Sequence, residues 1–123
     1  MSDTASKQGR ASREKGKRGE REVAELLRNY GIPAHRAQQF KGRAGAFDVE
    51  CPFLTSLGAE VEVKNTSTVS LPAWLKKAWE DVTVGFWPLI FWKRPRDQWY
   101  VILPAHEFVA LLDKVRMPDG RPD

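Results

Sequence analysis

Three segments of the chain carry apolar residues at helical spacing. The first predicts a helix over residues 14–29, which Gly31 ends. The second predicts a helix that begins near Ser70 and ends before Gly85, and the third predicts a helix over residues 104–115. The three apolar stripes are Val23, Leu26, Leu27 and Tyr30; Leu71, Leu75, Ala78 and Val82; and Phe108, Leu111, Leu112 and Val115.

Other segments alternate apolar and polar residues at the period of a β-strand. Residues 46–51 place Asp48 on one face and Val49 on the other, and residues 59–65 repeat this alternation. The remaining expected segments are strands at 34–40, 87–92 and 98–103 and a connecting loop at 52–58. The order helix, three strands, helix, two strands, helix predicts a single α/β domain, with a central mixed sheet flanked by helices.

The excess positive charge lies at the start of the chain. Residues 1–19 carry six Lys/Arg against two acidic residues, and the difference, 6 − 2 = +4, equals the net charge of the whole chain. Residues 1–13 have no apolar period, so we expect a disordered basic arm before a domain at 14–116 and a tail at 117–123. Such an arm suits nucleic-acid phosphates, and the alternative is a solvated tail without a partner.

Cysteine and histidine usage limits the kinds of site that the chain can form. The single cysteine, Cys51, excludes an internal disulfide, and two histidines are too few for a structural zinc site. The polar start shows no signal peptide, and no run reaches the ~20 apolar residues of a membrane span. We therefore expect a cytoplasmic protein with no membrane partner and no small-molecule cofactor.

Acidic residues on two neighbouring strands form the most informative pattern. Asp48 is followed by Glu62 and Lys64, which strand period places on one face, ~7 Å apart. If the two strands pair as a hairpin, Asp48 lies opposite Glu62, and a bound cation would relieve the repulsion between the carboxylates. Magnesium is typically bound by one or two carboxylates and substrate phosphates. The alternative is a solvated sheet face on which Lys64 balances the acids.

The same residues carry a family resemblance. Glu20 with its neighbours Arg21 and Glu22, then Asp48, then Glu-x-Lys at residues 62–64, resemble the PD-(D/E)xK nuclease superfamily. Within it, the chain is most similar to archaeal-type Holliday junction resolvases and their small phage-borne relatives. Those proteins begin with a Gly-x-x-x-Glu-Arg-Glu helix followed by a Gly-φ-x-x-x-Arg segment.

Residues 16–22 and 31–36 repeat this layout, and the resemblance covers roughly residues 14–103. Phe47 stands where the family name places proline. The downstream part matches the archaeal enzymes poorly and is richer in tryptophan.

The resemblance implies a catalytic metal site. Asp48 and Glu62 would bind Mg²⁺, with Mn²⁺ as an alternative ion, and the backbone carbonyl of Val63 would be a third ligand. Lys64 would orient or deprotonate the attacking water and stabilise charge on the phosphate. Glu20 would complete the acidic pocket as a further ligand.

Basic residues near this site are expected to contact DNA phosphates. The resemblance assigns Arg21 and Arg36 to phosphates beside the scissile bond, and the basic loop before Asp48 adds further contacts. The expected DNA-binding residues are Lys17, Arg18, Arg21, Arg36, Lys41 and Arg43. No motif for reading base edges is visible, so recognition by shape is expected.

The expected function is that of a Mg²⁺-dependent endodeoxyribonuclease acting in DNA recombination or repair on branched DNA, four-way junctions above all. A homodimer would supply the two sites that symmetric cuts of a junction need, and the tryptophan-rich segment 86–99 is a candidate interface. One alternative is a phage-type nuclease that acts on other DNA structures or nicks duplex. Another is a catalytically inactive DNA-binding accessory module.

Overall fold

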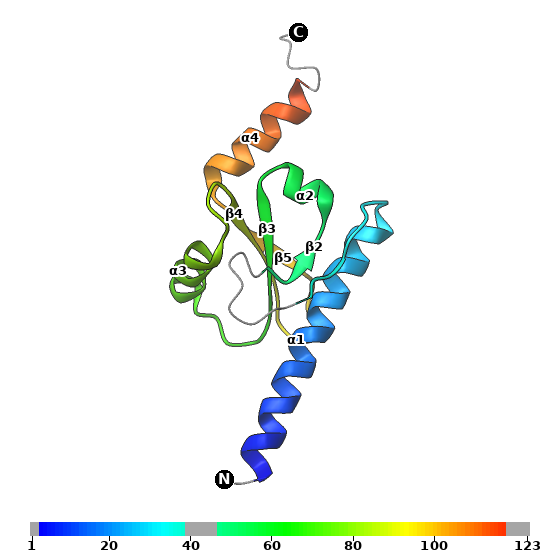
Figure 1. Cartoon of the computed structure of the whole chain (residues 1–123), viewed down its shortest axis with the longest axis vertical. Coiled ribbons are helices and arrows are strands. Elements are labelled where there is room, and N and C mark those ends of the chain that lie inside the picture. The colour runs from blue at the N-terminus through cyan, green and yellow to red at the C-terminus, as the bar shows by residue number, and fades with distance from the viewer. Residues whose placement is uncertain (1–2, 39–46, 118–123) are drawn as a thin grey trace.

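A five-stranded mixed sheet forms the centre of the molecule in the computed structural model, which describes residues 3–38 and 47–117 (Figure 1). The strand order is β1-β2-β3-β4-β5, in which β3 and β4 are parallel and the other neighbours are antiparallel. The elements are α1 Asp3–Asn29, β1 His35–Arg36, β2 Val49–Glu50, α2 Pro52–Ser56, β3 Ala59–Asn65, α3 Leu71–Asp81, β4 Trp87–Lys93, β5 Tyr100–Ile102 and α4 Ala105–Arg116. The predicted α/β fold with a mixed sheet flanked by helices is confirmed.

The hydrophobic core lies between α1 and one face of the sheet. α1 packs against β1, β2 and β3, and its buried Val23 and Ala24 belong to one apolar cluster with Val61 of β3 and Leu89 of β4. α3 provides the crossover between the parallel strands β3 and β4, and its Ala78 is buried near Ile90 on the opposite face. The sheet is therefore covered by α1 on one side and by α3 on part of the other.

Two predictions of local structure are wrong. The expected disorder fails for residues 3–13, which form the first turns of α1, and the expected loop at 52–58 contains α2. Six of residues 3–13 are Ala, Lys, Gln or Arg, which are good helix formers, and extending an existing helix costs little per residue. Pro52 stands in the first turn of α2, where proline's missing N–H is tolerated. The domain limits at 14–116 stay a prediction.

Other element boundaries differ by a few residues. β3 has the predicted bounds, whereas β2 and β5 are shorter than the segments expected for them. The third predicted helix is present as α4. Because α4 extends away from the sheet, Phe108, Leu112 and Val115 of its apolar stripe are exposed and Leu111 is only half-buried. No helix within the described ranges is both long and apolar enough to cross a membrane.

Candidate active site

The hairpin register of β2 and β3 brings two carboxylates together. Val49 pairs with Val61 in antiparallel register, which puts Asp48 opposite Glu62 as the strand alternation predicted. The Asp48 backbone N–H donates to the Val61 carbonyl at 2.8 Å, and Asp48 Oδ2 accepts from the Val63 N–H at 2.7 Å. The backbone of Asp48 is thus bound to Val61 and its side chain to Val63, the two residues on either side of Glu62 in β3.

Glu62 holds its proton far more tightly than an ordinary glutamate. Burial is the largest cause, followed by the negative charge of Asp48 and the hydrogen bond between the two carboxyl groups, and together they raise its pKa to about 8. Lys64 opposes this shift, and Asp81 adds to it. Two carboxylates that destabilise each other's charge are stabilised by a shared proton or by a cation between them.

α1 carries a third carboxylate to the same region. Gly19 lets the helix approach β3 closely, since a Cβ there would lie 3.0 Å from Asn65 Cβ. The next residue, Glu20, is half-buried, and burial and then the charge of Asp48 raise its pKa, while Arg36 and Arg21 oppose the rise. Arg36 Nε donates to Glu20 Oε1 at 2.7 Å. The predicted phosphate contact Arg36 is therefore paired with Glu20 in the DNA-free protein.

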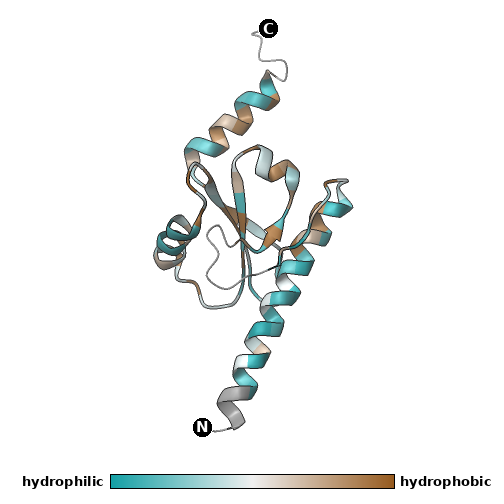
Figure 2. Ribbon diagram, in the orientation of Figure 1, coloured by the Kyte–Doolittle hydropathy of each residue, from teal (hydrophilic) through white to brown (hydrophobic). Residues whose placement is uncertain are grey.

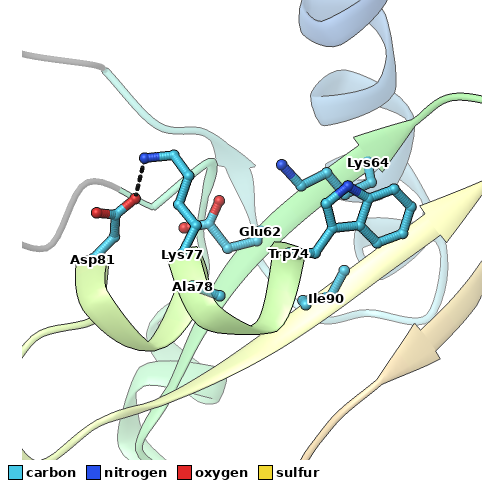
Figure 3. A pocket seen from close by; sticks show the side chains of 7 residues that line it. All are labelled: Glu62, Lys64, Trp74, Lys77, Ala78, Asp81 and Ile90. Atoms are coloured by element: carbon cyan, nitrogen blue, oxygen red, sulfur yellow. Dashed lines mark hydrogen bonds and ion pairs between the residues drawn. The ribbon is translucent and has the colours of Figure 1, made fainter. Parts of the chain in front are cut away.

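A small pocket lies beside Glu62, between β3 and α3 (Figure 3). Lys64 reaches along its rim with Nζ 5.9 Å from the centre of the Trp74 ring. The residues that line the pocket are Glu62, Lys64, Trp74, Lys77, Ala78, Asp81 and Ile90. The predicted pair Glu62 and Lys64 thus faces a helix that the sequence reading did not connect with the site.

Lys77 and Asp81 are the charged residues of this wall that sequence reasoning missed. A signal was present, because Trp74, Lys77, Ala78 and Asp81 stand at i, i+3, i+4 and i+7 and therefore share one face of α3. The face was overlooked because the apolar stripe beside it accounted for the helix on its own.

The remaining acidic residues of the two strands have other partners. Glu60 accepts hydrogen bonds from the Thr83 backbone N–H and from Thr83 Oγ1, each at 2.7 Å. Glu50 Oε2 lies 2.9 Å from His35 Nε2. Glu50 and Glu60 therefore form hydrogen bonds to other residues, whereas Asp48 and Glu62 are in contact with each other.

Basic side chains follow one face of α1 toward the carboxylates. At 3.6 residues per turn, six of them fall within an arc of roughly 140°. We name this set the basic stripe; it consists of Lys7, Arg10, Arg13, Lys17, Arg18 and Arg21. Lys17 is half-buried and the other five are exposed. The stripe begins on the N-terminal half of α1, which projects away from the sheet and is called the projecting half below (Figure 1). It ends at Arg21, whose charge acts on Glu20. The predicted contacts Lys41 and Arg43 lie outside the described residues.

Comparison with known protein families decides the class of protein. Residues 11–118 match the family model described as "Phage putative PDDEXK endonuclease". The chain belongs to this family. The match confirms the predicted membership in the PD-(D/E)xK nuclease superfamily and supports an endonuclease that acts on DNA. No curated protein and no solved structure matches the chain significantly.

The donor set of the endonuclease fits a hard cation that also binds substrate. Within residues 3–38 and 47–117, no group of three or more His, Cys, Asp and Glu side chains is placed to hold a metal. Asp48 and Glu62 are two carboxylates in hydrogen-bond contact, and Mg²⁺ usually binds one or two carboxylates while keeping water and phosphate ligands. Direct ligation by Asp48 and Glu62, as well as by Glu20 and the Val63 carbonyl, stays a prediction.

Proposed function

We propose that the chain is a Mg²⁺-dependent endodeoxyribonuclease that cleaves branched DNA, with four-way junctions as its preferred substrate. The observation that carries the metal dependence is the contact between the carboxyl groups of Asp48 and Glu62 in a partly buried site, where burial first and then the contact with Asp48 raise the pKa of Glu62 to about 8. A binding protein gains nothing from two carboxylates that repel both each other and the phosphates of DNA. A nuclease gains a site for a divalent cation.

The chain's own residues would divide the reaction between them. Asp48 and Glu62 would hold Mg²⁺, or Mn²⁺ in its place, and Val63 would add its carbonyl. A bound divalent cation supplies hydroxide near neutral pH and neutralises charge on the transferred phosphate. Lys64, on the same strand face as Glu62, would orient the attacking water and stabilise the phosphate oxygens.

Glu20 would have a supporting role in this arrangement. Its ion pair with Arg36, at 2.7 Å, would place a guanidinium close to the carboxylates before DNA binds. Arg21 and Arg36 would then contact phosphates beside the scissile bond, since a guanidinium can form paired hydrogen bonds with phosphate oxygens.

The basic stripe supports a DNA substrate with an extended duplex arm. From Lys7 to Arg21 the stripe covers 14 residue steps, or ~21 Å of helix at 1.5 Å per residue. A helical stripe would bind the DNA backbone along one line, in contrast to a disordered arm. Phosphate contacts of this kind give affinity without sequence readout, which is what recognition of branched shape requires.

A homodimer would allow paired cuts across a junction. Exposed apolar residues on β5 and α4 support an interface there, since Tyr100, Val101, Phe108, Val109, Leu112 and Val115 are each 45% or more exposed. Two copies related by a twofold axis would present two equivalent sites. The activity would take place in the cytoplasm of a prokaryotic host.

A panel of labelled substrates tests the substrate preference. Wild-type protein is incubated in Mg²⁺ with a synthetic four-way junction, matched duplex, a flap and single-stranded DNA. Paired symmetric cuts on the junction at a rate well above that on duplex are expected. Equal cutting of all four would overturn the junction preference and favour the general phage-type nuclease. Tight binding without cutting in either Mg²⁺ or Mn²⁺ would favour the inactive accessory module.

A further inference from the structure

A lysine on α3 faces the site from the side opposite to Lys64. Lys77 lines the pocket beside Glu62, and its Nζ lies 3.0 Å from Asp81 Oδ2 on the next turn of the helix (Figure 3). We propose that Lys77 is a phosphate-binding residue of the nuclease, paired with Asp81 before DNA arrives and transferred to a backbone phosphate when DNA binds. The proposal rests on the proposed nuclease function.

The location of Lys77 separates it from an ordinary surface lysine. It lines the same pocket as Glu62 and Lys64, although it comes from a different element. Its ammonium is also within electrostatic reach of the reacting region, because the charge of Glu62 is among the causes that raise the pKa of Lys77, after Asp81. A phosphate held beside Glu62 would therefore have Lys64 on the strand side and Lys77 on the helix side.

The pairing with Asp81 is easy to exchange. The Lys77 side chain is 71% exposed, and exposed ion pairs at i, i+4 spacing contribute little to stability because water and salt screen them. A DNA phosphate next to a bound divalent cation offers a charged acceptor at a less hydrated position, where a lysine acts as a compact point charge. Until then, Asp81 holds the flexible lysine side chain at the pocket, which lowers the ordering cost of phosphate binding.

The helix contains a matched control for this idea. Lys76 forms the equivalent i, i+4 pair with Glu80 at 2.6 Å, and its side chain is 78% exposed. Lys76 and Glu80 belong to the same helix and have the same chemistry, but they are not among the residues that line the pocket. If positive charge on α3 only attracted DNA in general, or only stabilised the helix, replacing either lysine would lower activity by a similar factor. A contact with phosphate at the site would appear only at Lys77.

The test compares steady-state cleavage of a labelled four-way junction by wild type, Lys77→Ala, Lys76→Ala and Lys77→Arg. Because Lys77→Ala removes a charge-assisted hydrogen bond to phosphate, it is expected to lose about tenfold to a hundredfold in kcat/KM. Lys76→Ala is expected to stay within about twofold of wild type, and Lys77→Arg is expected to restore most of the loss. Equal melting temperatures of the four proteins would exclude a folding defect.

The outcomes separate this proposal from the one on which it rests. If wild type cleaves and Lys77→Ala equals Lys76→Ala, the role of Lys77 is overturned while the nuclease function stands. If Lys77→Ala loses activity and Lys77→Arg restores it, the phosphate contact is supported. If wild-type protein cleaves no substrate in Mg²⁺ or Mn²⁺, the nuclease function fails and the role of Lys77 fails with it.

Discussion

The two faces of β3 use the same strand for opposite purposes. On one face, Ala59 and Val61 are buried against α1 in an apolar cluster. On the other face, Glu62 and Lys64 line an open pocket, and Glu62 is in contact with a second carboxyl group. One face gains stability by removing apolar surface from water, whereas the other contains a repulsion that only a proton or a cation relieves.

The hydropathy of the ribbon shows the same division along α1 (Figure 2). Its half nearest the sheet buries Val23 and Ala24, whereas the projecting half is hydrophilic and carries the first three residues of the basic stripe. Among the described residues, no polar or charged side chain is fully buried. The molecule thus keeps its apolar core apart from the charged surface that we assign to DNA and metal.

Removing one carboxylate charge from the polar face of β3 is expected to have the largest effect on cleavage. Asp48→Asn and Glu62→Gln should each lower cleavage at least a hundredfold, since even residues that only support metal ligands are typically worth 10–100-fold. DNA binding measured by fluorescence anisotropy in a chelator should be unchanged or tighter, because a negative charge is removed. Retained turnover in either variant would contradict the site.

A cavity in the core beneath the apolar face of β3 is expected to lower the stability of the fold. Leu89→Ala should destabilise the fold by about 2–5 kcal/mol, because Leu89 is buried in the cluster beneath α1. Urea unfolding followed by circular dichroism measures the loss. The specific activity of the folded fraction should stay close to that of wild type, and a selective loss of activity without destabilisation would contradict the division between the faces.

The projecting half of α1 is tested by charge removal without shortening the helix. Replacing Lys7, Arg10 and Arg13 by glutamine should lower the slope of log affinity against log salt by about 2–3, at ~0.9 per lost phosphate contact with duplex DNA. The affinity for a junction at moderate salt should fall about tenfold. Lys114→Gln on α4 serves as the control, and an unchanged slope in the triple variant would make this half of the helix a passive extension.

The smallest expected effect is a gain in stability on the polar face. Glu62 has its pKa raised from 4.5 to about 8 in the folded protein. The folded state therefore binds this proton more tightly than the unfolded state, so the contribution of Glu62 to stability is fully present below pH 4.5 and is lost as the pH rises through about 8. Glu62→Gln removes this dependence and should raise the melting temperature at pH 8 by on the order of a few degrees.

The measurement is a series of thermal melts from about pH 5 to pH 9 in a chelator. Glu25→Gln provides the control, because Glu25 is an exposed carboxylate on α1. Parallel profiles for wild type and Glu62→Gln would show that Glu62 ionises normally in the folded protein.

Much of the site could be predicted from the sequence because period-2 alternation decides which residues of a strand share a face. It placed Glu62 and Lys64 together and, with one assumption about pairing, brought Asp48 opposite Glu62. The ordered motif also led from Glu20 to the correct nuclease superfamily. These features depend on local geometry, which a sequence expresses directly.

The parts that were missed depend on how separate elements meet. The helical spacing of Trp74, Lys77 and Asp81 was visible, but nothing in it indicates that this face of α3 turns toward Glu62. The pairing of Arg36 with Glu20 likewise requires the packing of β1 against α1. The helicity of residues 3–13 was missed because a lack of apolar periodicity indicates only that a segment has no core contacts. It does not exclude the continuation of a helix anchored further along the chain.

The central claim is that Asp48, Glu62 and Lys64 form a metal-dependent phosphodiesterase site. The most direct measurement is cleavage of a 5′-labelled four-way junction by wild type and Lys64→Ala, each in Mg²⁺ and in excess chelator. Strand cuts by wild type in Mg²⁺, abolished by the chelator and strongly reduced in Lys64→Ala, are predicted. Cutting that persists in the chelator, or that is unchanged in Lys64→Ala, would contradict the account.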